Sequence, residues 1–73
     1  MSDKVKMYKE MYPEGTRIEL IHMEDAQAVP SGTKGTVRLV DDMGTIHMKW
    51  DNGSTLGLIP EADSFRKIKE ESI

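Results

Sequence analysis

The stretch that decides the fold runs from Gly32 to Ile59 and reads Gly-Thr-Lys-Gly-Thr-Val-Arg-Leu-Val-Asp-Asp-Met-Gly-Thr-Ile-His-Met-Lys-Trp-Asp-Asn-Gly-Ser-Thr-Leu-Gly-Leu-Ile. It contains three short runs in which apolar and polar residues alternate, separated by turn signals at residues 41–44 and 51–53. Such alternation is typical of strands that bury one face, and clusters of Asp, Asn and Gly are typical of turns. The stretch therefore predicts a meander of three antiparallel strands.

The second turn can be placed because residues directly opposite each other in a sheet share a face. A two-residue turn at Asn52 and Gly53 would mix charged and aliphatic residues on one face. A three-residue loop over 51–53, closed by Gly53 in the left-handed region, separates them. The pairs that this loop predicts are Met48 with Leu56, Ile46 with Leu58, and Lys49 with Thr55.

The same reasoning predicts a four-residue loop over 41–44. Because Gly35 has no side chain, we expect the indole of Trp50, its predicted partner, to lie across its backbone. The other predicted pairs are Leu39 with Ile46 and Val37 with Met48. The predicted core is Ile18, Leu20, Val37, Leu39, Ile46, Met48, Trp50, Leu56 and Leu58, joined by Phe65 and Ile68.

The rest of the chain is predicted to pack around this meander. Residues 2–12 predict a short amphipathic helix, capped by Ser2 and ended by Pro13. This helix either docks on the barrel or remains available to bind a partner. Residues 16–22 predict a strand and residues 23–31 an irregular, solvated excursion. Near the C-terminus, Asp63 and Ser64 resemble the cap of a helical turn, and residues 65–69 predict a fifth short strand.

These elements predict a mainly β chain: a small SH3-like five-stranded barrel with a short N-terminal α-helix. An OB-type barrel fits less well, because it normally inserts a helix between its third and fourth strands. We expect a single domain over residues 1–73. It divides into an N-terminal helix and linker over 1–13, the barrel over 14–69 and a frayed tail over 70–73.

The composition limits the classes of function that this chain can have. The chain has 73 residues, a net charge of −3 and no cysteine, and its apolar runs are too short for a transmembrane helix. The charged start, Met1 to Lys6, has no apolar signal region, so we expect a cytoplasmic protein. A dedicated nucleic-acid binder usually has a clear basic excess, which the overall balance lacks.

Several motifs occur in an order that resembles a known family, the small bacterial domain-of-unknown-function family numbered forty-three-fourteen. The motifs are Tyr12-Pro13-Glu14-Gly15-Thr16-Arg17, Gly32-Thr33-Lys34-Gly35-Thr36-Val37, Val40-Asp41-Asp42-Met43-Gly44, His47-Met48-Lys49-Trp50-Asp51-Asn52-Gly53-Ser54 and Asp63-Ser64-Phe65-Arg66. The resemblance covers nearly the whole chain. It implies the small barrel and an association with bacterial phages or mobile elements, but no established activity.

Catalytic motifs are missing from the sequence. It contains no nucleophile motif, no phosphate-binding glycine loop and no helical pair of metal-binding histidines. A five-stranded barrel of this size also rarely encloses a catalytic pocket. We therefore expect a non-enzymatic protein without cofactor or metal.

Two sets of residues are candidate binding sites. The first is the outward face of the meander, a flat and mildly basic surface formed by Thr36, Arg38, His47, Lys49 and Thr55. The second is a pair of acidic loops that could flank a groove for a basic peptide, formed by Glu24, Asp25, Asp41 and Asp42. Each set also has a simpler interpretation: a solvated sheet face for the first, and aspartates that cap their own turns for the second.

The leading hypothesis is an interaction module that binds an unknown protein partner, encoded by the same phage or mobile element. The alternative is a nucleic-acid-binding module that uses the outer face, with Arg38 and Lys49 on phosphates. That face has no aromatic residue for base stacking, which weakens the single-strand version. We expect no membrane association, and a monomer or a weak homodimer formed through an edge strand or the helix.

Overall fold

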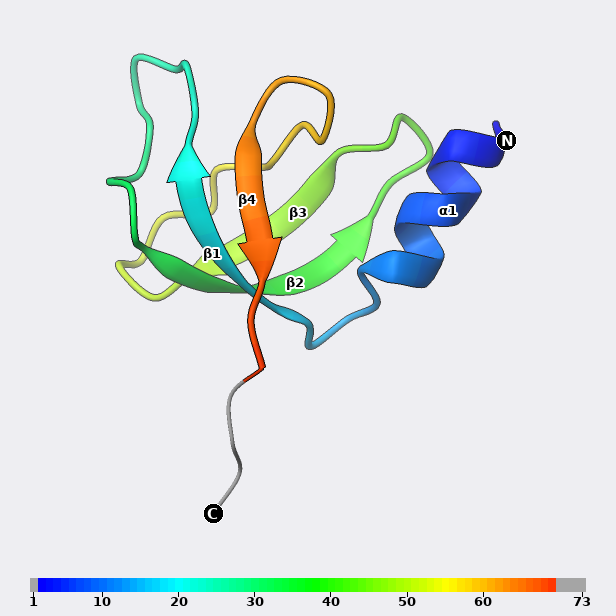
Figure 1. The fold of residues 1–73 in the computed structure, drawn as a ribbon, viewed down its shortest axis with the longest axis horizontal. Helices are drawn as coiled ribbons and strands as arrows, with labels where there is room; N and C mark the ends of the chain where they lie inside the picture. Colours follow the sequence, from blue (N-terminus) through cyan, green and yellow to red (C-terminus); the bar gives the residue numbers. More distant parts are fainter. Residues whose placement is uncertain (1, 70–73) are drawn as a thin grey trace.

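The computed structural model describes residues 2–69, which form one helix and four strands (Figure 1). The elements are α1 (Asp3–Met11), β1 (Arg17–His22), β2 (Lys34–Val40), β3 (Ile46–Trp50) and β4 (Ser64–Lys67). The strands form one antiparallel sheet in the order β3-β2-β1-β4. The chain is therefore mainly β with a short N-terminal helix, as predicted. The predicted frayed tail over 70–73 lies outside the described residues.

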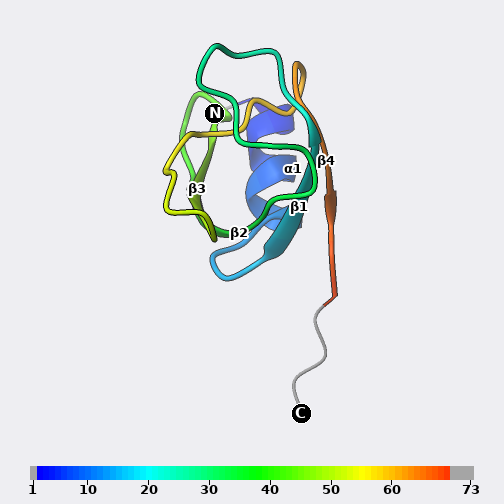
Figure 2. The ribbon, with the colours of Figure 1, turned by 90° about the vertical axis from the view of Figure 1, so that its left-hand side faces the viewer.

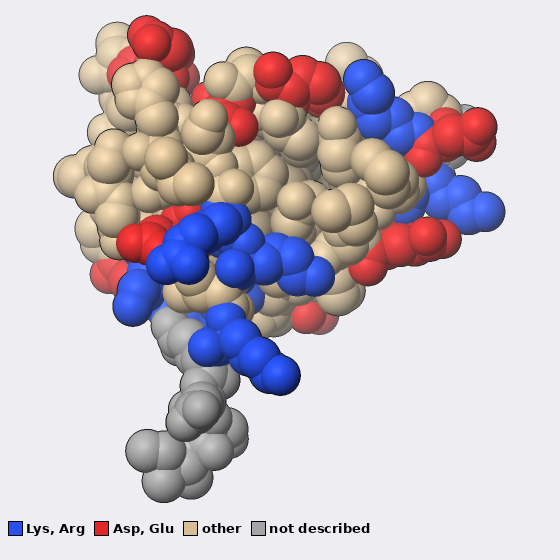
Figure 3. Space-filling model, viewed as in Figure 1, with Lys and Arg blue, Asp and Glu red and all other residues tan. Residues whose placement is uncertain are grey.

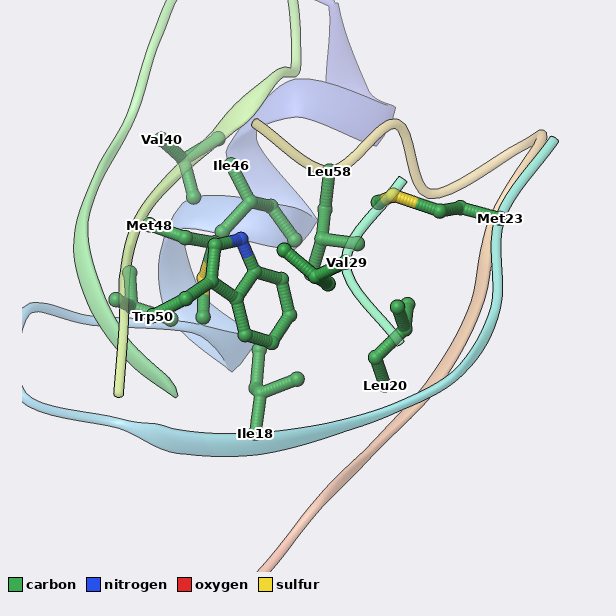
Figure 4. Close-up of a cluster of buried hydrophobic side chains, with 10 residues drawn as sticks. Ile18, Leu20, Met23, Val29, Val40, Ile46, Met48, Trp50 and Leu58 are labelled. Carbon is green, nitrogen blue, oxygen red and sulfur yellow. The ribbon is translucent and has the colours of Figure 1, made fainter. Parts of the chain in front are cut away.

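The sheet is strongly bent. In Figure 2, β3 lies on one side, β1 and β4 lie on the other, and β2 joins the two sides. The inner face of the bend holds the core, with Trp50 at its centre (Figure 4). The buried cluster consists of Ile18, Leu20, Met23, Val29, Val37, Val40, Ile46, Met48, Trp50 and Leu58. Tyr8, Tyr12, Leu56 and Phe65 are half-buried against it.

The two turns of the meander have the same hydrogen-bond pattern. In the second, the Trp50 amide donates to the Ser54 carbonyl (2.9 Å) and the Gly53 amide to the Trp50 carbonyl (3.0 Å). Gly53 has φ +93°, in the left-handed region, so the predicted three-residue loop is confirmed. In the first turn the Asp41 amide donates to the Thr45 carbonyl (3.0 Å), so that loop spans 42–44 and is one residue shorter than predicted.

The shorter first turn changes what faces the core near it. Val40, rather than Leu39, pairs with Ile46, and Leu39 pairs with His47. The predicted burial of Leu39 is therefore wrong: it is 50% exposed, whereas Val40 is 7% exposed. A bulge between Val37 and Leu39 absorbs the extra residue, because two residues of β2 there oppose one residue of β3.

Farther from the turn, the predicted register is confirmed: Val37 pairs with Met48 and Gly35 with Trp50. Trp50 lies against Gly35, as expected. A Cβ added to Gly35 would lie 2.6 Å from Cε3 of the Trp50 ring, so only glycine leaves room for the indole. The indole Nε1 donates to the Leu56 carbonyl (2.7 Å), which satisfies its one polar atom inside the core.

The predicted strand after the second turn does not form. Residues 54–59 contribute only an isolated bridge between Ile46 and Leu58, in the predicted register. The sheet of residues 2–69 therefore has four strands and is not closed, so the five-stranded barrel is not confirmed. Leu58 is still fully buried, because its single bridge places it against the core.

The loop between β1 and β2 is anchored at two points. Residues 23–33 form no helix or strand, as predicted. Met23 and Val29 are buried (6% and 5% exposed), so the expectation of a wholly solvated excursion is wrong. These two side chains extend the core beyond the end of β1.

The N-terminal helix docks on the sheet. Ser2 caps it, because its hydroxyl accepts a hydrogen bond from the Val5 amide (3.2 Å), and Val5 is its one buried residue. The methyl groups of Val5 lie beside Gly44, in the first turn of the meander. The Lys9 ammonium also pairs with the Asp42 carboxylate of that turn (2.7 Å). Docking is needed, because a nine-residue helix is marginal by itself.

The last segment completes the sheet. β4 pairs with β1, and Phe65 meets the Tyr12 ring edge-on at a centroid distance of 5.6 Å. The turn before β4 covers residues 60–62, so Asp63 closes a turn rather than beginning a helical one. Its carboxylate accepts a hydrogen bond from the Ile59 amide (2.8 Å). Ile68 is not part of the buried cluster, and its amide donates to the Arg17 carbonyl on β1 (3.0 Å).

Candidate functional site

The predicted outer face of the meander is convex rather than flat, because the sheet bends (Figure 2). Thr36 and Lys49 lie opposite each other on it, as predicted. The Thr36 hydroxyl accepts a hydrogen bond from Arg17 Nη1 (2.9 Å) on β1. Thr55 is exposed but lies outside the strands. This part of the face is therefore partly used to hold β1 and β2 together.

Arg17 forms a two-pronged ion pair across the sheet. Its two terminal nitrogens lie 2.9 and 2.7 Å from the two carboxylate oxygens of Asp51, which begins the second turn. This geometry gives two parallel charge-assisted hydrogen bonds. The bond from Arg17 holds the pKa of the Asp51 carboxyl below its usual value. Sequence reasoning missed this pair, because Arg17 and Asp51 are far apart along the chain.

Arg38 and His47 have different surroundings. Arg38 is exposed within the bulge, and its side chain forms no hydrogen bond or ion pair within residues 2–69. His47 Nε2 lies 2.8 Å from the Asp41 carboxylate. Asp41 also accepts hydrogen bonds from the Met43 and Thr45 amides (2.9 and 3.0 Å). The His47 bond first, and the amide bonds with it, lower the pKa of the Asp41 carboxyl.

The four predicted acidic residues do not line one groove. The loop with Glu24 and Asp25 and the turn with Asp41 and Asp42 lie toward opposite ends of the molecule (Figure 1). Each carboxylate has a local contact: Glu24 with His22 (3.0 Å), Asp25 with the Gln27 amide (2.7 Å), Asp41 with its turn, and Asp42 with Lys9. The contacts of Asp25 and Asp41 match the simpler interpretation, in which aspartates cap their own turns, whereas Asp42 pairs with the helix instead.

A hollow that the sequence did not indicate lies where the end of β4 runs beside the start of β1. Its volume is about 300 Å³, and it is lined by Lys34, Arg66, Lys67, Ile68 and Lys69. Figure 3 shows Lys and Arg side chains gathered over this end of the sheet. We call these five residues the basic hollow. Four of them carry a positive charge.

Strand pairing explains why these residues meet. Glu19 of β1 pairs with Lys34 of β2 on one side and with Arg66 of β4 on the other. These three side chains therefore form a row across the outer face. Arg66 Nε donates to the Glu19 carboxylate (2.7 Å), while Lys67 Nζ donates to the Met11 carbonyl at the end of α1 (2.8 Å).

Two cations of the basic hollow are left for another molecule. The side chains of Lys34 and Lys69 are exposed and form no hydrogen bond or ion pair within residues 2–69, although the Lys34 charge helps to lower the pKa of the Asp51 carboxyl. The only sequence signal for the hollow was the basic run Arg66-Lys67-Ile68-Lys69. That run indicates a site only once β4 is known to pair with β1, because the pairing brings in Lys34 across Glu19.

Charge is segregated between the strands and the rest of the chain. The charged residues of the four strands are Arg17, Glu19, Lys34, Arg38, Lys49, Arg66 and Lys67, of which only Glu19 is acidic. Most of the remaining carboxylates lie in turns and loops. A chain with a net charge of −3 thus presents a basic sheet.

Among residues 2–69, no three His, Asp or Glu side chains lie close enough together to hold a metal ion. The one helix that the structure describes is too short to cross a membrane.

Fold and surface together define a small mainly-β domain with one docked helix and a basic sheet. Its sequence matches the model of the family described as "Domain of unknown function (DUF4314)" over residues 1–68. The chain belongs to this family, which confirms the resemblance seen in its motifs. No curated protein and no solved structure matches it significantly.

Proposed function

We propose that this chain is a non-enzymatic interaction module that binds an acidic protein partner at the basic hollow. The observation that carries the proposal is the gathering of four cations in one hollow of a chain whose net charge is negative. Complementary charge mainly provides specificity and a fast encounter, which suits a module that selects one partner. The proposed setting is the bacterial cytoplasm, with a partner encoded by the same phage or mobile element.

A protein partner fits this surface better than a nucleic acid. The aromatic side chains Tyr8, Tyr12, Trp50 and Phe65 are all buried or half-buried, so none is offered for base stacking. The basic hollow contains the aliphatic Ile68 besides its cations, and apolar contacts are typical of protein interfaces. We also infer that the fold is an open form of the SH3-like barrel. The bridge between Ile46 and Leu58 supports this, because it lies where a further strand would close the sheet.

The proposal can be tested by affinity capture from a cell that encodes the chain, using three baits. The wild-type chain is compared with Lys34→Glu/Lys69→Glu, which reverses two charges of the basic hollow. The matched control is Lys4→Glu/Lys6→Glu, which makes the same charge change on exposed residues of α1. We expect an acidic protein that is retained by the wild type and the control and lost by the hollow variant, with or without nuclease.

Two results would contradict the proposal. If the hollow variant retains every protein that the wild type retains, the hollow is not the binding site. If retention is lost on nuclease treatment, the partner is a nucleic acid, as in the alternative hypothesis.

A further inference from the structure

We propose that the acidic partner binds as an extended peptide segment that adds to β4 as a new edge strand. This rests on the proposed function and specifies its geometry. Strand addition is a common mode of peptide recognition, in which main-chain hydrogen bonds provide affinity and alternate side chains provide specificity. Three features of β4 lead to this inference: its free backbone groups, the contrast with the other edge of the sheet, and its charge.

The backbone groups at the free edge of β4 can be assigned from its pairing with β1. The Ile68 amide donates to the Arg17 carbonyl, so the backbone of Ile68 faces β1. Backbone direction alternates along a strand, so that of Arg66 also faces β1. The amides and carbonyls of Phe65 and Lys67 must then face away from the sheet. Outside the pairing with β1, no backbone hydrogen bond in the described part of the chain involves them.

The two edges of the sheet differ in what covers them. At the β3 edge, the Ile46 amide and carbonyl bond to Leu58 (2.9 and 2.8 Å), and the Trp50 amide bonds to Ser54. At the β4 edge, neither the helix nor another strand lies alongside, since β4 neighbours only β1. An exposed edge of this kind is a template for a further strand. Among residues 2–69 the sheet therefore has one edge without a neighbouring segment, the β4 edge, and this edge borders the basic hollow.

Charge selects the occupant of this edge. Arg66 and Lys67 lie on β4 itself, and Lys34 and Lys69 lie in the same hollow. A strand paired with β4 would place every second side chain on the Arg66 side of the sheet, the face that also carries Lys34, whereas Lys67 lies on the other face. Glutamate or aspartate at those positions is favoured. A second copy of this chain, paired through its own β4, would place Arg66 and Lys67 against their equivalents, which like-charge repulsion disfavours.

The test uses a synthetic peptide that alternates glutamate with threonine over about ten residues, the upper length of a common strand. It is titrated into the isotope-labelled chain at low salt, and amide chemical shifts and exchange rates are followed by NMR. We expect saturable shifts along β4 and around Lys34 and Lys69. We also expect slower solvent exchange of the Phe65 and Lys67 amides, because these would donate to the peptide backbone.

A charge-matched control separates strand addition from simple attraction. A peptide that alternates glutamate with proline has the same charge and length but lacks half of the backbone donors. We expect it to bind roughly tenfold more weakly or worse, because several main-chain hydrogen bonds are lost. The variant Lys34→Gln/Lys69→Gln should weaken the glutamate–threonine peptide roughly threefold or more, and Lys4→Gln/Lys6→Gln should leave it unchanged.

Each alternative outcome overturns strand addition in a recognisable way. Equal binding of the two peptides, with unchanged exchange at Phe65 and Lys67, indicates charge attraction alone and leaves the proposed function intact. Binding of neither peptide indicates that the cations only protect an edge strand from aggregation, which is another common use of edge lysines. Shifts confined to Arg38 and Lys49 would place the site on the convex face instead. A single-stranded oligonucleotide that outcompetes the peptide would assign the hollow to nucleic acid.

Discussion

Gly35 and Trp50 hold the bend of the sheet at the scale of single residues. Trp50 is the largest buried side chain, and it lies across the backbone of Gly35 on the neighbouring strand. Its ring nitrogen also donates to the carbonyl of residue 56, which belongs to the segment that replaces the predicted third strand of the meander. One side chain thus connects β2, β3 and the chain that follows.

Substitution of Gly35 tests its contact with Trp50. In Gly35→Ala the new Cβ would lie 2.6 Å from Cε3 of Trp50 and 3.1 Å from the Met48 methyl group, so the indole must shift. We expect a loss of about 1–3 kcal/mol in the free energy of unfolding, as for other overpacked cores. Urea denaturation followed by the fluorescence of Trp50, the sole tryptophan, measures it. The control is Lys34→Ala, one residue earlier on an exposed position; equal stability of the two variants would contradict the prediction.

At the scale of elements, pattern reasoning succeeded where the burial pattern and turn chemistry agreed. It predicted the helix, β1 and β2, the loop at 51–53 and the pairing of Gly35 with Trp50, because alternation and glycine position gave the same register. It failed at Leu39 because the loop over 42–44 is shorter by one residue. A bulge between Val37 and Leu39 then restores the predicted pairing farther along the strands. A bulge also interrupts the alternation of inward and outward side chains from which strand faces are inferred.

The remaining misses have a different cause. Met23 and Val29 lie in an irregular segment, where no periodicity indicates which side chain is buried. Residues 54–59 alternate like a strand, yet only Leu58 forms a bridge. The basic hollow was missed because it joins residues of β2 and β4, which are neighbours only through β1. Local patterns predict elements, whereas this site depends on the order of strands in the sheet.

The helix is the element whose docking is most easily tested. Val5 is its only buried side chain, so Val5→Asp would place a charge against the first turn of the meander. We expect α1 to undock and lose its helical structure, because it is too short to persist alone, while the sheet remains folded. Hydrogen exchange should quicken at the α1 amides, and the fluorescence of Trp50 should stay native. Met7→Asp, on the exposed side of α1, should leave the helix in place.

At the scale of the whole molecule, several acidic side chains stabilise turns and ion pairs, while most charged side chains of the strands are basic. Asp42 contacts Lys9 of the helix, Asp51 contacts Arg17 of β1, and Asp41 holds its own turn and His47. These three carboxylates therefore make their contacts with other groups of the same chain. Several cations remain for a partner, which is why the negative net charge is a poor guide to the binding surface.

This distribution predicts how stability depends on pH. Hydrogen bonds and nearby cations lower the pKa of the carboxyls of Asp41, Asp42 and Asp51 in the folded chain. Groups with a lowered folded pKa stabilise the fold fully above their unfolded pKa, which is near 4, and lose this contribution as pH falls through the folded pKa. We expect the urea midpoint to be steady from neutral pH to about pH 5 and to fall steeply below about pH 4.

A single variant tests how much of the pH dependence of stability comes from the ion pair between Arg17 and Asp51. Asp51→Asn removes the negative charge that Arg17 holds, so its urea midpoint should lie below that of the wild type at neutral pH. The gap should narrow as pH falls through the lowered pKa of the wild-type carboxyl, because that carboxyl then loses its charge as well. Glu61→Gln, which removes a charge from an exposed residue without an ion pair in the described part of the chain, is the control. A gap for Asp51→Asn that stayed constant down to pH 2 would show that Asp51 acts through the shape of its turn, and that its charge does not stabilise the bent sheet.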